Sequence, residues 1–105
     1  MKIRYSPSAR DDLRQLKAYL TIQFGAVVAA KSVAKIISDI STLKRHPSLA
    51  RALSDKIGRE TPYLYLLCGK YSIAILSEDA NVYSVVRILD GRTDYVKTIF
   101  VDDSE

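Results

Sequence analysis

The side chains best suited to binding or catalysis lie in one C-terminal stretch, RILDGRTDYVKTIF, residues 87–100. It holds six ionisable side chains: Arg87, Asp90, Arg92, Asp94, Tyr95 and Lys97. RNA cleavage without a metal needs a general base, a general acid and cations on the phosphate, and Arg, Lys and Tyr can supply all three. A structural interpretation stays equally open. In that interpretation Arg87 pairs with Asp90 or Asp94, and Tyr95 packs a terminal helix onto a sheet.

The cations expected near a nuclease site are few. In the predicted sheet region they are Lys70, Arg87 and Arg92, whereas most basic residues lie on predicted helices and the loop after them. The best candidates for RNA cleavage are therefore Arg87, to stabilise phosphate charge, and Tyr95, to donate or accept a proton. Lys56 and Arg59 of the loop would assist them. A complete acid–base set is missing.

Metal and nucleophilic chemistry have little support. The single histidine, His46, stands at a predicted helix end, where it can interact with the last carbonyl groups. The single cysteine, Cys68, has only Lys70 nearby as a cation, so it is interpreted as a passive small residue. Four scattered glycines form no phosphate-binding loop. We therefore expect no metal and no cofactor.

Charge is distributed unevenly along the chain. Residues 1–59 hold 12 Lys and Arg against 4 Asp and Glu, a net +8. Residues 60–105 hold 4 against 8, a net −4. The basic first half is typical of a protein with an acidic partner, either a nucleic acid or an acidic protein, but equally of a solvated helical surface.

Two helices are predicted to follow a short strand at residues 2–5, where polar and apolar residues alternate. The first runs from Ser8 to Gln23, with Ser8 and Asp11 as a capping pattern, and stops at Gly25. The second runs from Ala26 to Arg45. The one-residue break between them predicts an antiparallel helical hairpin.

The second half of the chain is predicted to be mostly strands. After a polar loop at residues 48–60, strands are expected at 62–67, 71–76 and 82–89, the last one in the interior of the sheet. Short turns between them favour an antiparallel meander. A short helix at 94–100 and an acidic tail follow. Helices gathered on one face of an antiparallel sheet make the fold class α+β.

Length and composition bound the rest. A chain of 105 residues is expected to be one domain spanning 1–105. A lone cysteine suits a reducing cytosol, and neither a signal pattern nor a membrane-length apolar run is present. The expected location is therefore the cytoplasm, without contact with a membrane.

Four stretches together resemble the RelE/ParE superfamily of toxin–antitoxin toxins, over about residues 3–100. They are the opening strand and helix, the exit of the second helix, a Gly-basic-Tyr strand and the ending, written YSPSARDDLRQLKAYL, ISTLKRHPSLAR, GKYSIAIL and VVRILDGRTDYVKTIF. The resemblance implies the α+β fold described above.

The ending is more similar to the ParE branch than to the RelE branch. RelE-type members are ribosome-dependent mRNA endonucleases and often carry an arginine after the strand tyrosine, where Ser72 stands here. ParE-type members lack the nuclease set and poison DNA gyrase. Arg87, Leu89, Gly91 and Asp94 are in register with that branch, although Asp90 replaces its usual histidine.

The resemblance thus implies a non-enzymatic toxin that binds DNA gyrase. A cognate antitoxin would neutralise it by covering an apolar groove on the helical hairpin and sheet, and operator DNA would be reached only through the antitoxin. The residues predicted to contact target or antitoxin are Arg87, Asp90, Arg92, Tyr95, Lys97, Phe100, Leu13 and Leu20. A ribosome-dependent mRNA endonuclease is the alternative. A degenerate module that still binds its antitoxin is the third possibility.

Overall fold

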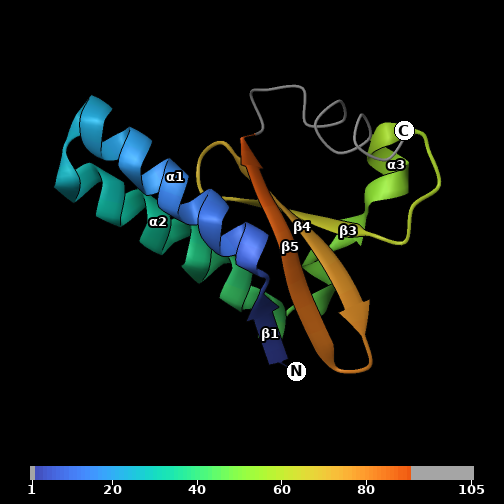
Figure 1. Cartoon of the computed structure of the whole chain (residues 1–105). Coiled ribbons are helices and arrows are strands. Elements are labelled where there is room, and N and C mark those ends of the chain that lie inside the picture. The colour runs from blue at the N-terminus through green and yellow to red at the C-terminus, as the bar shows by residue number, and fades with distance from the viewer. Residues whose placement is uncertain (1, 91–105) are drawn as a thin grey trace.

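Two helices lie side by side against one face of a five-stranded sheet in the computed structural model, which describes residues 2–90 (Figure 1). In chain order the elements are β1 (Lys2–Tyr5), α1 (Pro7–Phe24), α2 (Ala26–Ser41), η1 (Thr42–Lys44), η2 (Pro47–Leu49), β2 (Arg51–Ala52), α3 (Leu53–Ile57), β3 (Leu64–Cys68), β4 (Ser72–Asp79) and β5 (Val82–Asp90). The strand order is β1-β5-β4-β3-β2. The α+β class, the N-terminal strand, the helical hairpin and the antiparallel meander are confirmed.

The sheet is antiparallel except at one edge. β1 pairs with β5 in parallel, from Lys2 opposite Val82 to Tyr5 opposite Val85. β3, β4 and β5 form the predicted meander, with a register irregularity between Ile75 and Leu76. β5 lies between β1 and β4, so its prediction as an interior strand is confirmed.

Helix α1 begins at Pro7, one residue earlier than predicted. Ser6, not Ser8, is its N-cap, and the Ser6 hydroxyl accepts a hydrogen bond from the Ala9 N–H at 3.0 Å. Pro7 then occupies the first helical position, where its missing N–H costs nothing. The capping pattern assigned to Ser8 and Asp11 was wrong because a proline at the first position makes the residue before it the cap.

The start of α1 also protects the edge of β5 beyond the end of β1. The Ser6 N–H donates to the Val85 carbonyl at 2.9 Å, and the Ser6 hydroxyl donates to the Val86 carbonyl at 2.8 Å. An open strand edge can pair with another chain, so covering it with a helix keeps the sheet closed on this side.

The hairpin turns at Gly25, as predicted, with a φ of 94° that a residue with a side chain rarely adopts. Helix α2 ends earlier than predicted, at Ser41 instead of Arg45. Residues 42–44 form a tighter 3-10 turn, and the Thr42 hydroxyl donates to the Asp39 carbonyl. Such turns commonly satisfy the last carbonyl groups of a helix.

The segment predicted to be a polar loop, residues 48–60, contains ordered elements. β2 adds an edge strand beside β3, and α3 follows directly. Leu53 of α3 is fully buried, and its N–H donates to the Tyr63 carbonyl at 3.1 Å. One buried leucine therefore anchors this segment, which the polar composition around it conceals.

The sheet buries both of its faces. On the side of α1 and α2, a cluster of buried side chains includes Ile40, Leu43, Leu76 and Val85. On the other side Ile73 and Ile75 pack with Leu53 and Leu89. Because neighbouring residues of a strand point to opposite faces, the second cluster lies across the sheet from the hairpin. Helix α3, in the segment predicted to be a loop, therefore packs on the face opposite the two helices of the hairpin.

Strand boundaries differ from prediction by a few residues. β3 begins at Leu64 instead of Pro62, and β4 runs from Ser72 to Asp79 instead of 71–76. The following turn is short, with Ala80 at a φ of 53°. β5 extends one residue further than predicted, to Asp90. The predicted helix at 94–100 and the acidic tail lie outside the described residues.

Two glycines with positive φ allow a matched test of the packing at the β3–β4 turn. A Cβ at Gly69 would lie 2.8 Å from Cγ1 of Ile36, whereas a Cβ at Gly58 would meet nothing within 4 Å. We expect Gly58→Ala to cost about 1 kcal/mol through backbone strain alone, and Gly69→Ala about 2–3 kcal/mol. Urea unfolding of the two variants measures both costs. Equal losses would contradict a tight contact between the turn and α2.

Candidate functional site

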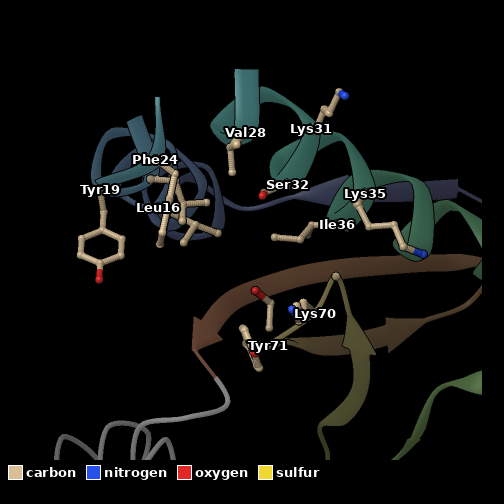
Figure 2. A pocket seen from close by; sticks show the side chains of 13 residues that line it. Leu16, Tyr19, Phe24, Val28, Lys31, Ser32, Lys35, Ile36, Lys70 and Tyr71 are labelled. Carbon is tan, nitrogen blue, oxygen red and sulfur yellow. The ribbon is translucent and has the colours of Figure 1, made fainter. Parts of the chain in front are cut away.

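A groove of about 460 Å³ separates the far half of the helical hairpin from the β3–β4 turn. Figure 2 shows side chains from both helices above the opening and side chains of the turn below it. The residues that line it are Leu16, Tyr19, Leu20, Phe24, Val28, Lys31, Ser32, Lys35, Ile36, Gly69, Lys70, Tyr71 and Ser72.

Helix α1 supplies one wall. Leu16 and Leu20 are four residues apart, so they lie on the same helix face, where both are half-buried. Tyr19, the neighbour of Leu20 in the chain, is 51% exposed, and Phe24, the last residue of α1, is 63% exposed. This wall is therefore largely apolar and combines half-buried and exposed side chains.

Helix α2 supplies the second wall with mixed chemistry. Val28, Ser32 and Ile36 recur at four-residue spacing along the groove, and Ile36 is buried at its inner end. Lys31 and Lys35, also four residues apart, lie on the outer side of the same face. The α2 wall therefore combines two apolar side chains and a serine with two lysines.

The third wall is the β3–β4 turn, which Asp39 holds against α2. One oxygen of the Asp39 carboxylate accepts the Gly69 N–H at 2.7 Å, and the other accepts the Lys35 ammonium at 2.7 Å. We call these two hydrogen bonds the Asp39 clasp. Next to Gly69 in the chain, the Lys70 ammonium lies 5.4 Å from the centre of the Tyr71 ring, a cation–π distance. The turn thus brings a third lysine to the groove.

The Asp39 clasp has a predictable pH dependence. Burial raises the pKa of Asp39, but the hydrogen bonds from Lys35 and from the Gly69 N–H, with the Lys35 charge, outweigh it and lower the pKa from its ordinary 3.8. A carboxyl whose pKa is lower in the folded state stabilises the fold above its unfolded-state pKa, and this stabilisation is lost as the pH falls through the folded-state pKa.

We therefore expect Asp39→Asn to be less stable than the wild type at pH 7, with the difference shrinking as the pH falls below 3.8. Denaturant unfolding of both proteins across pH 7 to about pH 2.5 measures the difference. A difference that stays constant with pH would mean that the carboxylate charge plays no part in the clasp.

Cys68, the neighbour of Gly69 in the chain, is 2% exposed. Burial, with the nearby Asp39 charge, raises the pKa of its thiol to about 12. Because the thiolate is the reactive form, we expect no reaction with a thiol reagent at pH 8 in the folded protein and full reaction in denaturant. Modification of the native protein at the rate of a free thiol would contradict this placement.

Arg87, the central candidate of the sequence, is bound to helix α1. Its Nε donates to Oδ2 of Asp12 at 2.8 Å, and its Nη2 donates to Oδ1 at 3.1 Å. The same Oδ2 also accepts the Ile88 N–H at 2.9 Å. Asp12 therefore joins α1 to β5, and the Arg87 side chain remains 37% exposed.

The other predicted site residues are spread over the molecule. Leu20 lines the groove, whereas Leu13 packs against the main core. Lys56 lies on α3, 5.4 Å from the centre of the Tyr65 ring, and Arg59 is exposed just after that helix. Asp90 ends β5 and is half-buried. Arg92, Tyr95, Lys97 and Phe100 lie outside the described residues.

Of the residues that line the groove, sequence reasoning assigned only Leu20 to a site; the others come from three separate segments, namely α1, α2 and the β3–β4 turn with the first residue of β4. A signal was present only on α2, where two lysines four residues apart flank an apolar stripe. The sequence gives no indication that the β3–β4 turn folds back onto that stripe.

The tip of the hairpin extends the apolar surface of the groove to the outside. Ile22, Val27 and Phe24 are 81%, 68% and 63% exposed. Exposed apolar residues that are contiguous typically mark an interaction site. Phe24 belongs to both the tip and the groove, so the two surfaces are continuous.

Residues 2–90 carry neither a cluster of metal ligands nor a helix suited to span a membrane. In this range no three or more His, Cys, Asp and Glu side chains gather where they could hold a metal ion. No described helix combines the length and the apolar character that crossing a membrane requires.

Comparisons with known proteins agree with this architecture. A family model described as the ParE toxin of the type II toxin–antitoxin system, parDE, matches residues 3–95. A solved structure described as the chromosomal ParDE TA system from P. aeruginosa is similar, with a TM-score of 0.71 and 17% identity over 86% of this chain and 95% of that chain. At this identity the likeness shows the fold. No curated protein matches the sequence significantly.

Proposed function

This chain belongs to the ParE toxin family of type II toxin–antitoxin systems, and from that premise we propose that it arrests growth by inhibiting DNA gyrase until a cognate antitoxin neutralises it. The observation that carries the proposal is the family match over residues 3–95. The match covers the helical hairpin and also the end of β5, where the sequence is more similar to the ParE branch than to the RelE branch. The proposed location is the cytoplasm, where both partners would be met.

The groove supports the antitoxin part of the proposal. It is an apolar channel beside an exposed apolar tip, and a monomeric protein rarely leaves such a surface uncovered. An amphipathic segment that lays its apolar face into a hydrophobic groove is a common way to recognise a protein. We propose that the antitoxin binds here, and that operator DNA is reached through the antitoxin.

The placement of Arg87 supports a binding toxin over an endonuclease. Its guanidinium makes two hydrogen bonds to Asp12, and that carboxylate neutralises the charge that a phosphate would need. We propose that the toxin acts by binding gyrase, and that Asp90, Arg92, Tyr95, Lys97 and Phe100 contribute to the contact with the target.

Expression in bacteria with separate reporters for DNA damage and for protein synthesis tests the proposal. Induction without antitoxin is expected to stop growth and to activate the DNA-damage reporter before protein synthesis falls. Co-expression of the antitoxin is expected to restore growth.

Two other results would each favour a different function. Immediate arrest of protein synthesis, with mRNA cuts that vanish in Arg87→Ala, would identify a ribosome-dependent endonuclease. Unimpaired growth, with the protein folded and expressed, would identify a module that only binds its antitoxin.

A further inference from the structure

Helix α1 supports one side of β5 where β1 no longer does. β1 ends at Tyr5, and the Ser6 hydroxyl then donates to the Val86 carbonyl at 2.8 Å. Two residues further along β5, the Ile88 N–H donates to Oδ2 of Asp12 in α1 at 2.9 Å. Figure 1 shows α1 beginning directly after β1, beside β5. The last part of this strand is therefore fastened to the helix by a side-chain carboxylate.

Asp12 holds two successive residues of β5 at once. Its Oδ2 also accepts a hydrogen bond from Nε of Arg87 at 2.8 Å, and its Oδ1 accepts one from Nη2 of the same guanidinium at 3.1 Å. A paired contact of this kind fixes the orientation of both groups as well as their distance. The Asp12 side chain is 13% exposed. It is therefore placed to hold the strand, with little surface to offer to a partner.

The chain continues from this fastened end into the residues proposed to meet the target. β5 ends at Asp90, two residues after Ile88, and Asp90 is opposite Ser72 of β4. Arg92, the first proposed target contact after the strand, follows only two positions later. The end of β5 therefore sets where the segment 91–105 begins and in which direction it starts.

We propose that Asp12 is a positioning residue for the contact with the target. It fixes the end of β5, and thereby the starting point and direction of the segment 91–105, without contacting the target itself. This inference rests on the proposed function, since that segment is taken to bind gyrase. Without the carboxylate, the end of β5 would have to be ordered again when the target binds, which costs affinity.

Asp12→Ala removes all three hydrogen bonds and tests the proposal. We expect the toxin concentration that halves supercoiling by purified gyrase to rise at least about tenfold, because ordering even one released residue costs roughly that factor. Asp12→Asn is the milder second variant. Its NH2 group replaces one acceptor oxygen, so we expect an intermediate rise with the fold more nearly preserved. Circular dichroism and urea unfolding verify that each variant is folded under the assay conditions.

Leu43→Ala is the control for lost stability. Leu43 is fully buried in the main core, in η1 after the end of α2, and truncating a buried leucine is at least as destabilising as the loss of a polar contact. We expect this variant, while folded, to inhibit gyrase at the concentration of the wild type. Affinity for the cognate antitoxin gives a second separation. Asp12 is not among the residues that line the groove, so Asp12→Ala should change this affinity by no more than about twofold.

Hydrogen exchange shows whether the end of β5 is released, independently of any target. In Asp12→Ala, exchange should accelerate at residues 88–90 by at least about tenfold relative to residues 82–85, where β1 pairs with the strand. Leu43→Ala should show no such difference between the two ends of β5.

Three results would overturn this inference alone: equal inhibition of gyrase by the wild type and Asp12→Ala, an equal loss of inhibition in Leu43→Ala, or an equal loss of antitoxin binding and gyrase inhibition in Asp12→Ala. Unchanged exchange at residues 88–90 would also overturn it. A wild-type chain that leaves gyrase unaffected would contradict the proposed function and, with it, the positioning role. The behaviour of the wild type therefore distinguishes the two failures.

Discussion

Replacing Asp12 with alanine is expected to lower the free energy of unfolding by about 3 kcal/mol, the largest loss we predict for a polar side chain here. The Asp12 side chain is 13% exposed and accepts three hydrogen bonds, two from Arg87 and one from the Ile88 N–H. The substitution removes both hydrogen bonds between this carboxylate and the Arg87 guanidinium and takes away the acceptor of the Ile88 N–H.

The partner substitution is expected to be milder. Arg87→Ala should cost about 1 kcal/mol, because the side chain is 37% exposed and Asp12 still accepts the Ile88 N–H. Urea unfolding of the two single variants and the double variant measures the coupling between the residues. If Arg87→Ala were the more damaging change, the structural role would belong to arginine and the explanation given for Asp12 would be wrong.

Leu53→Ala is expected to cost about 3 kcal/mol, because it creates a cavity under α3 in the smaller of the two cores. Leu53 is fully buried and packs with Ile73, Ile75 and Leu89. Loss of this anchor should also release the short helix, so hydrogen exchange should accelerate at residues 53–57 more than in β4. Thermal or urea unfolding, with hydrogen exchange on the same variant, measures both effects.

Leu49→Ala is the control for this substitution. Leu49 lies in the preceding 3-10 turn and is 47% exposed, so its removal should cost well under about 1 kcal/mol. Similar losses for the two leucines would contradict the assignment of Leu53 as the anchor of α3.

The sequence predicted those parts of the fold in which the pattern is local. The apolar stripe of α2 recurs at helical spacing, Gly25 interrupts it, and alternation marks the strands, so the hairpin and the meander could both be placed. The N-cap was misplaced by two residues because Ser6 and Ser8 both flank Pro7. Pro7 at the first helical position makes Ser6 the cap, and the hydrogen bond from the Ser6 hydroxyl to Val86 adds a tertiary contact.

The features missed by sequence reasoning depend on residues far apart in the chain. Asp12 and Arg87 are 75 positions apart, so the arginine was expected to pair with acids in its own stretch. The α3 segment is only five residues long, too short for its Leu53 and Ile57 to show a helical pattern among polar neighbours. Periodicity cannot indicate either contact, since both arise from the way the tertiary fold brings the strands to the helices.

The sequence predicted the type of candidate site, an apolar groove, and one of the residues that line it. An apolar groove on the hairpin and sheet was expected from the family resemblance, and Leu20 lies in it. The lysines at the rim of the groove were not predicted. Lys70 lies there because the neighbouring Gly69 is hydrogen-bonded to Asp39, which is 30 positions away in the sequence. Arg92, Tyr95, Lys97 and Phe100, which lie outside the described residues, remain predicted contacts with the target or the antitoxin.

The most direct test of the account is a supercoiling and cleavage assay with purified DNA gyrase. The account predicts that this protein lowers supercoiling and, after denaturation of the enzyme, leaves plasmid DNA cut and covalently bound to gyrase. Addition of the cognate antitoxin before the toxin should abolish both effects. Unchanged supercoiling and no trapped cleavage, with gyrases from several bacteria and with protein of verified fold, would contradict the claim that this chain is a gyrase poison.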